Sequence, residues 1–155
     1  MFKIAILTIG DEVRIGQVVN TNAAWLSSQL TAAGTYVSEH RTIGDDREVM
    51  LREISELYNK YDMLITTGGL GPTHDDITKP ILLEYFNDKL IFSEEVETSL
   101  QNFLSNYQRP MTDVVKNQAM IPSTCIPLEN KVGTAPGLYF KKDKQNLIAL
   151  PGVPA

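Results

Sequence analysis

The stretch that decides the fold is Thr66-Thr67-Gly68-Gly69-Leu70-Gly71-Pro72-Thr73-His74-Asp75-Asp76. Three glycines within four residues allow the backbone to adopt positive φ angles and to approach a ligand closely. Successive N–H groups in such a turn can form a concavity that binds anions, and a following helix adds its N-terminal donors. The stretch has neither the Gly-Lys-Ser/Thr ending of a Walker A loop nor the glycine spacing of a dinucleotide-binding turn. The sequence therefore predicts a phosphate-binding turn, and the alternative is a tight strand-to-helix connection without a ligand.

Strands and amphipathic helices alternate on both sides of this turn. The apolar patterns predict strands over 3–9, 36–42, 62–67 and 124–127, and a late hairpin with arms 137–140 and 146–150. Helices are predicted after Thr21, Asp45, Asp76 and Ser93, with a short helix near 112–120. This order predicts one α/β domain over residues 1–155 with a mostly parallel sheet and an antiparallel edge.

Several of these helix starts have two interpretations. Thr21 is a plausible N-cap, and Asp45 with Glu48 resembles a capping box. Asp76 could cap the helix that follows the glycine turn, because Pro80 is tolerated only in a first turn. The functional alternative for Asp45 and Asp76 is metal coordination or proton transfer, and the spacing leaves both interpretations open.

Carboxylates gather in three loops that follow predicted strands. These loops are 10–20 with Asp11, 44–46 with Asp45, and 68–76 with Asp75 and Asp76. The carboxyl ends of parallel strands meet at one edge of a sheet, so we expect these loops to share a rim. Carboxylates that face an anion site need a cation between them, and Mg²⁺ typically bridges a carboxylate and substrate phosphates. The rim is therefore a candidate site for a divalent metal ion.

The composition excludes several classes of partner. A net charge of −5 and a pI near 5.0 argue against nucleic acid, which selects clustered Lys and Arg. No apolar run approaches the roughly 20 residues that a membrane span needs. The single cysteine, Cys125, excludes an internal disulfide and suggests a cytoplasmic, reducing location.

The assembled motifs resemble a known family. They follow the order found in the N-terminal domain of CinA-type (competence/damage-inducible) proteins and cover nearly the whole chain. They are Ile9-Gly10-Asp11-Glu12, 16–22, Gly44-Asp45-Asp46, 66–73, 75–79, 109–111, 117–119, 132–137 and Leu150-Pro151-Gly152-Val153-Pro154. The domain is also similar to the molybdopterin-binding domains of molybdenum-cofactor biosynthesis, the MoaB and MogA group.

The resemblance implies a three-layer α/β/α sandwich and a homo-oligomer. In the cofactor-biosynthesis relatives, aspartates matching Asp45 and Asp76 lie at the site that adenylylates molybdopterin. In CinA-type proteins this domain is associated with metal-dependent hydrolysis of ADP-ribose, and a separate C-terminal domain is a deamidase. We expect the present chain to be a domain cut short at its C-terminus, without the deamidase.

The leading functional hypothesis is metal-dependent cleavage of ADP-ribose. Asp45 and Asp76 would be catalytic, and Asp11, Asp75 and Asp76 would hold an ion of the Mg, Mn or Co class. The pyrophosphate would contact Asn22 and the turn residues Thr67, Gly68, Gly69, Leu70, Gly71, Pro72 and Thr73. The alternatives are a molybdopterin-binding or adenylylating protein with a pterin-like ligand, and a binding or oligomerisation module without turnover.

Overall fold

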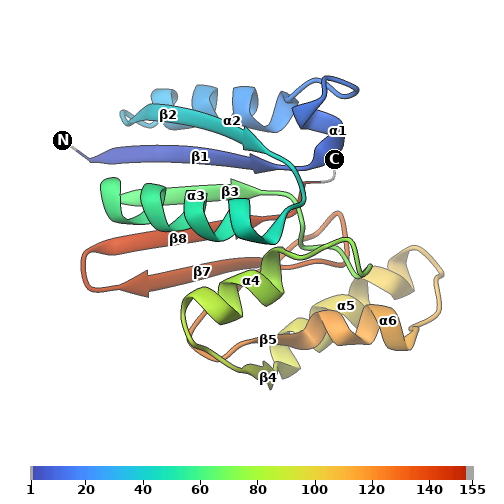
Figure 1. The fold of residues 1–155 in the computed structure, drawn as a ribbon. Coiled ribbons are helices and arrows are strands. Elements are labelled where there is room, and N and C mark those ends of the chain that lie inside the picture. The colour runs from blue at the N-terminus through green and yellow to red at the C-terminus, as the bar shows by residue number, and fades with distance from the viewer. Residues whose placement is uncertain (1, 153–155) are drawn as a thin grey trace.

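The centre of the molecule is a six-stranded mixed sheet. The structure is a computed structural model that describes residues 2–152. The strand order is β2-β1-β3-β8-β7-β6, and β7 runs opposite to the other five described strands (Figure 1). The strands are β1 (Lys3–Ile9), β2 (Tyr36–Ile43), β3 (Met63–Thr67), β6 (Ile126–Leu128), β7 (Gly137–Lys142) and β8 (Gln145–Leu150). The predicted mostly parallel α/β sheet with a hairpin edge is confirmed.

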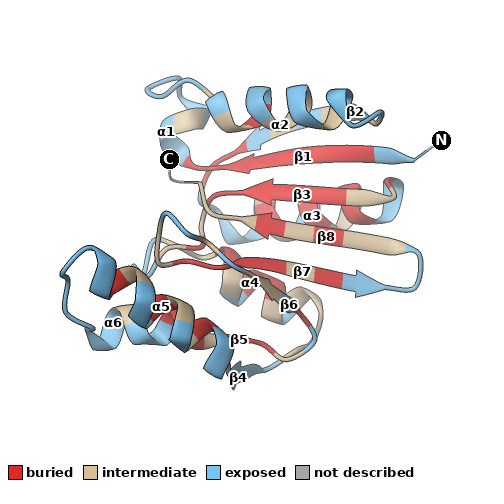
Figure 2. Cartoon of the chain, turned by 180° about the vertical axis from the view of Figure 1, so that it is seen from behind, coloured by how far each residue is buried: buried red, intermediate tan, exposed pale blue. Residues whose placement is uncertain are grey.

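Helices cover both faces of this sheet, as the predicted sandwich requires. Helix α2 lies on one face, while α3 and α4 lie on the other, and α5 and α6 lie beyond the β6–β7 edge (Figures 1 and 2). The helices are α1 (Asp11–Arg14), α2 (Thr21–Ala32), α3 (Arg47–Lys60), α4 (Thr78–Tyr85), α5 (Glu94–Asn106), α6 (Asp113–Lys116) and the 3-10 helix η1 (Asn117–Ala119).

The apolar run of β1 explains why it occupies the middle of the sheet. Its residues from Ile4 to Ile9 are all buried, as expected for a parallel strand covered on both faces. Ala5 and Leu7 pack with Met50 of α3 in the larger core cluster. Ile4 and Ile6 belong to a second cluster with Ala23 of α2. Alternate side chains of β1 therefore pack against the helix layers on both faces of the sheet. This packing holds β1, and with it the start of the following loop, in a defined position.

Three predicted N-caps each lie one residue away from the observed cap position. Asn20, not Thr21, caps α2, since its side-chain oxygen accepts from Ala23 N–H at 3.1 Å. Asp46, not Asp45, caps α3 by accepting from Val49 N–H at 3.0 Å. Helix α4 begins at Thr78 after Ile77 and has no side-chain cap, so Asp76 is not a cap. Neither Asp45 nor Asp76 therefore caps a helix, which was the structural interpretation of both residues.

A small two-stranded sheet, which the sequence did not predict, lies beside the main one. Strand β4 (Leu90–Phe92) pairs with β5 (Met120–Pro122). Asp88 anchors the pair by accepting from Ser123, from both donors of Thr124 and from Lys89 N–H. Burial alone would raise the pKa of Asp88, but these hydrogen bonds outweigh it and lower the pKa to about 2.

Candidate functional site

The carboxyl ends of β1, β2 and β3 form one rim, with a loop leaving each strand. From β1 the chain passes through α2 to β2 on one side, and it then returns through α3 on the opposite face to β3 on the other side of β1. The switch point therefore lies between β1 and β3. Such a switch point is where open α/β sheets bind ligands. Within the described residues, the three loops bring Asp11, Asp45 and the segment 68–76 together at this rim, as the sequence predicts.

Asp11 and Asp45 are the central pair of this rim. Each carboxylate accepts a hydrogen bond from the other residue's backbone N–H: Asp45 N to Asp11 Oδ1 is 3.2 Å, and Asp11 N to Asp45 Oδ2 is 3.3 Å. The two reciprocal bonds lock the loop after β1 against the loop after β2. They also hold two negative charges close to each other.

The ionisation of Asp45 reflects this crowding. Asp45 is exposed as a residue, yet the groups around its carboxylate partly desolvate it and raise its pKa. The bond from Asp11 N–H opposes the rise, and the charges of Asp11, Glu12 and Asp76 add to it. The effect of Asp76 on this pKa shows that Asp45 and Asp76 are electrostatic neighbours. A carboxylate with a raised pKa suits a role in proton transfer.

An open cavity of about 470 Å³ adjoins the pair. It is lined by Asp11, Arg14, Thr42, Ile43, Gly44, Asp45, Asp46 and Val49. The size falls within the range of small-molecule sites, roughly 300–1,000 Å³. Arg14 is the one Lys or Arg among these lining residues, and its Nε lies 3.7 Å from Asp11 Oδ1. The loop with Gly44 was predicted at this rim, whereas Arg14 was given no role from the sequence, because only the folded chain brings its side chain beside the cavity.

The first two glycines of the turn are required by the fold itself. Gly68 and Gly69 have φ angles of 106° and 76°, which disfavour any other residue. A Cβ on Gly68 would lie 2.1 Å from the Ile9 carbonyl oxygen, and one on Gly69 would lie 1.9 Å from Thr78 Oγ1. The Thr78 hydroxyl donates to Gly68 O at 2.9 Å. The turn is therefore a tight strand-to-helix connection, whether or not it binds a ligand.

The same turn still offers unused donors. Among the hydrogen bonds of the described chain, none uses the N–H groups of Gly69, Leu70 or Gly71. The Leu70 side chain is buried in the core, so this residue could contact an anion only through its backbone. Thr67 is buried at the end of β3, and Pro72 is exposed. Three consecutive free N–H groups are what an anion-binding concavity requires.

Asp76 closes the turn by accepting from Thr73. Thr73 N–H and Thr73 Oγ1 both donate to Asp76 Oδ2, at 3.2 Å and 2.7 Å. In the described residues Asp76 Oδ1 accepts no hydrogen bond, so half of the carboxylate stays available. This local bond explains why Asp76 is not the cap of α4.

Two predicted site residues, Asp75 and Asn22, do not line the open cavity. Asp75 and His74 have side chains 83% and 94% exposed and contact each other at 3.4 Å. Asn22 donates its side-chain N–H to the Gly152 carbonyl at 3.0 Å, which ties α2 to the segment after β8. The structure gives Asn22 a role in holding the rim together. Val153 and Pro154 of the last predicted motif lie outside the described residues.

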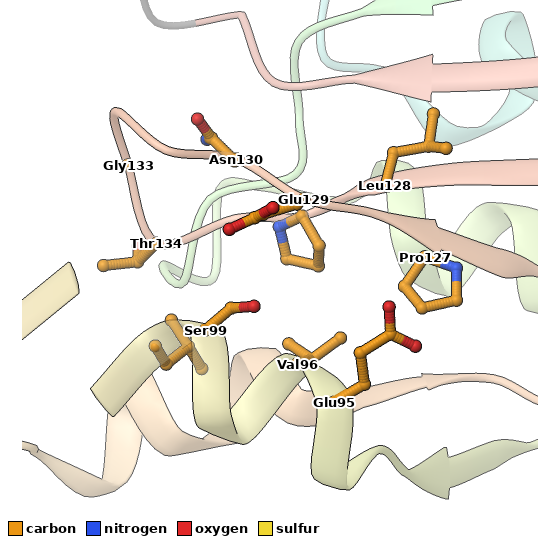
Figure 3. A pocket seen from close by; sticks show the side chains of 11 residues that line it. Glu95, Val96, Ser99, Pro127, Leu128, Glu129, Asn130, Gly133 and Thr134 are labelled. Carbon is orange, nitrogen blue, oxygen red and sulfur yellow. The ribbon is translucent and has the colours of Figure 1, made fainter. Parts of the chain in front are cut away.

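A second pocket lies between α5 and the segment around β6 (Figure 3). Its free volume is about 20 Å³, which is enough for about one water molecule. Val96 and Ser99 of α5 face Pro127 and Thr134 across it. None of the rim carboxylates lines this pocket, so the open cavity beside Asp45 is the candidate site.

Comparison with known proteins identifies the family. A family model described as "Probable molybdopterin binding domain" matches residues 5–155. The chain belongs to this family. Within it, a CinA-like protein of Flavobacterium psychrophilum is 48% identical over 153 residues, which cover 98% of this chain and 37% of that protein. A competence-damage inducible protein of Clostridium botulinum is 41% identical over 152 residues, with the same coverage. The predicted resemblance to CinA-type proteins is confirmed.

Solved structures agree with this membership of the molybdopterin-binding family. The CinA protein of Thermoplasma acidophilum is 32% identical and has a TM-score of 0.86, covering 98% of this chain and 90% of that one. The MoaB protein of Thermus thermophilus has a TM-score of 0.63 at 16% identity, which shows a shared fold. This family domain spans about 37% of the length of the two longer relatives named above.

The predicted metal ion can be tested against the donor set of this molybdopterin-binding-family domain. In the described part of the chain, no three His, Cys, Asp or Glu side chains are grouped so that they could hold a metal ion by themselves. Asp11 and Asp45 do supply two adjacent carboxylates whose mutual repulsion a cation would relieve. Mg²⁺ is commonly bound by one or two carboxylates plus substrate phosphates. The pair fits an ion that is completed by a phosphorylated ligand.

No described helix is both long and apolar enough to cross a membrane.

Proposed function

We propose that this domain binds a nucleoside diphosphate at the rim and hydrolyses ADP-ribose with the help of a divalent metal ion. The observation that carries the proposal is the Asp11–Asp45 pair at the edge of an open cavity of about 470 Å³. The free N–H groups of residues 69–71 would hold one phosphate of the substrate. The proposal thus uses both features of the rim: donors for an anion and carboxylates for a cation.

The residues divide the chemistry between them. Asp11 would hold the ion together with the substrate phosphates, and Oδ1 of Asp76 is a further candidate ligand. The bound ion would neutralise charge on the pyrophosphate. Asp45, whose pKa is raised, would accept a proton from the attacking water as the new P–O bond forms. The P–O–P bond then breaks, giving AMP and ribose 5-phosphate.

A pterin ligand is the second candidate. The description of the matching family names molybdopterin, and molybdopterin carries a phosphate that the same turn could bind. Adenylylation would also need a nucleotide and a metal ion at the rim. Both candidates predict the same donors around Gly69 and Gly71, so binding to the turn does not distinguish them, whereas the reaction products do.

One incubation separates these functions from a module without turnover. The protein is mixed with ADP-ribose and Mg²⁺, Mn²⁺ or Co²⁺, and AMP is measured by chromatography. A parallel sample contains EDTA, and a second one contains ATP with molybdopterin. We expect AMP in the first sample and none with EDTA. If ADP-ribose is unchanged with all three metals, the hydrolase proposal is wrong and a binding module is favoured.

A further inference from the structure

Arg14 is the residue of the cavity that neither the fold nor the carboxylate chemistry explains. It is the last residue of α1, and its side chain is 55% exposed. Its one ion pair in the described structure is with Asp11, at an N–O separation of 3.7 Å and three residues away. No hydrogen bond from its guanidinium group is found there, because 3.7 Å exceeds a hydrogen-bond distance.

This ion pair contributes little to stability. Many ion pairs between exposed side chains contribute nothing measurable to stability. Arg41 on β2 shows what a structural arginine does in the same protein. Its guanidinium group contacts the carboxylates of Glu39, Glu53 and Glu56, and its side chain is 24% exposed. Arg14 in contrast keeps its planar fork of donors free, next to a cavity.

The backbone of the rim leaves room for this arrangement. Gly44 lies in the loop after β2, and a Cβ there would lie 2.8 Å from Arg14 Nε and 2.3 Å from Asp11 Oδ1. The φ angle of Gly44 does not require glycine, so the missing side chain serves this close approach. Both Arg14 and Asp11 therefore sit directly over the Gly44 backbone at the mouth of the cavity.

The balance of charges around the cavity suggests what Arg14 does. Its lining has three carboxylates, those of Asp11, Asp45 and Asp46, against the one guanidinium group. A pyrophosphate would be repelled by this lining unless cations compensate. A divalent ion alone would leave one of the three carboxylate charges uncompensated, and Arg14 supplies the remaining positive charge in a fork geometry that matches two phosphate oxygens.

We propose that Arg14 is a substrate-binding residue that exchanges its weak pair with Asp11 for a phosphate of the bound nucleotide. This inference rests on the proposed function, and adds to it a residue that selects phosphorylated ligands. When Arg14 moves to the phosphate, Asp11 loses its cation partner and becomes available to the metal ion. Ligand and metal binding would then reinforce each other.

The test is calorimetric titration with Mg²⁺ present, using inorganic pyrophosphate, adenosine and an ADP-ribose analogue whose bridging pyrophosphate oxygen is replaced by a methylene group, so that hydrolysis does not contribute heat. The variants are Arg14→Gln, Arg14→Lys and a control, Arg52→Gln. Arg52 is an exposed arginine of α3 that pairs with Glu53 at 3.5 Å and does not line the cavity. The control therefore removes the same charge from elsewhere on the surface. Melting temperatures confirm that each variant is folded.

We expect Arg14→Gln to raise the Kd of both phosphorylated ligands about tenfold, the lower end for a charged hydrogen bond because the site is exposed. Arg14→Lys should recover part of this loss, and Arg52→Gln should change the Kd by less than about twofold. Adenosine should bind parent and Arg14→Gln equally. If the parent binds the ADP-ribose analogue and Arg14→Gln binds it equally well, the role of Arg14 is refuted alone. If the parent binds neither pyrophosphate nor the analogue, both proposals are refuted.

Discussion

Two neighbouring aspartates with different duties give the sharpest test of the site. Asp45 accepts from Asp11 N–H at 3.3 Å, while Asp46 caps α3 by accepting from Val49 N–H at 3.0 Å. Replacing either by Asn removes one negative charge and keeps an oxygen that can accept the same hydrogen bond. The two substitutions therefore change the charge equally and differ only in the position of the lost carboxylate.

The structure sets the expected effect of each change. Asp45→Asn should not lower the melting temperature, because the desolvated, repelled carboxylate of Asp45 is disfavoured in the folded state when ionised. A raised folded-state pKa means that this carboxylate lowers stability as pH rises through it, so the Asn variant should gain stability at neutral pH. Hydrolysis of ADP-ribose should fall by about a hundredfold or more if Asp45 accepts the proton.

Asp46 supplies the matched controls. Asp46→Asn should leave melting close to the parent, because Asn caps helices as well as Asp does. It should change hydrolysis far less than Asp45→Asn does, because the Asp46 carboxylate caps α3 and is not the proposed proton acceptor. Asp46→Ala removes the cap at a cost of about 0.5–2 kcal/mol, which for a chain of this size lowers the melting temperature by roughly 1–8 °C. Both properties are measured on the same samples by thermal melting and AMP release. Parent-like hydrolysis by Asp45→Asn, or an equal loss in Asp46→Asn, would refute the assignment of Asp45.

Two further predictions concern the glycine turn at residues 68–76, and a third concerns the loss of stability at acidic pH. Gly69→Ala should destabilise by about 2 kcal/mol more than Gly16→Ala in urea unfolding. Both glycines have positive φ, at 76° and 83°, but only a Cβ on Gly69 meets Thr78. Asp76→Asn should keep the fold, because an oxygen still accepts from the turn, while hydrolysis falls about a hundredfold if this carboxylate is catalytic. The pKa of Asp88 is about 2 in the folded protein, against an ordinary value of 3.8. Asp88 should therefore stabilise the fold at pH values above 3.8, and this contribution should be lost as the pH falls towards 2. Asp88→Asn should flatten the pH dependence of unfolding in that range, and an unchanged profile would contradict this.

The hydrophobic periodicity, together with the Gly and Pro residues that end each pattern, was enough to predict the main strands and helices of the fold. The continuous apolar run of β1, the helical stripe through Met50, Ile54 and Leu57, and the hairpin of β7 and β8 all formed close to the predicted bounds. These segments bury most of their apolar side chains in the core, so the hydrophobic pattern determines them directly. Strand β4 was missed because its three residues are exposed and it depends on a partner, β5, that is 30 positions away.

The candidate site was predicted in its location better than in its contacts. Strand ends placed Asp11, Asp45 and the glycine turn on one rim, which topology alone determines. A sequence pattern does not fix a helix start to one residue, so the capping and catalytic interpretations of Asp45 stayed open until the structure gave the cap to Asp46. Asp75 is adjacent to Asp76 in sequence, yet it points to His74 and solvent. Contacts such as Arg14 over Gly44 depend on loop geometry between distant segments, and no local pattern encodes them.

The glycines of the turn show why a motif is weaker evidence for a ligand than the donors it leaves free. Gly68 must be glycine because its neighbour is the Ile9 carbonyl, and Gly69 because of Thr78, so the fold alone would retain both. Their presence therefore does not distinguish a phosphate site from a compact connection. The N–H groups of residues 69–71 are the better evidence, because they make no hydrogen bond within the described residues and successive free donors can bind an anion. These donors of the described turn, at a rim that also holds Asp11, Asp45 and Arg14, therefore support the proposal of a bound phosphate more strongly than the glycines themselves do.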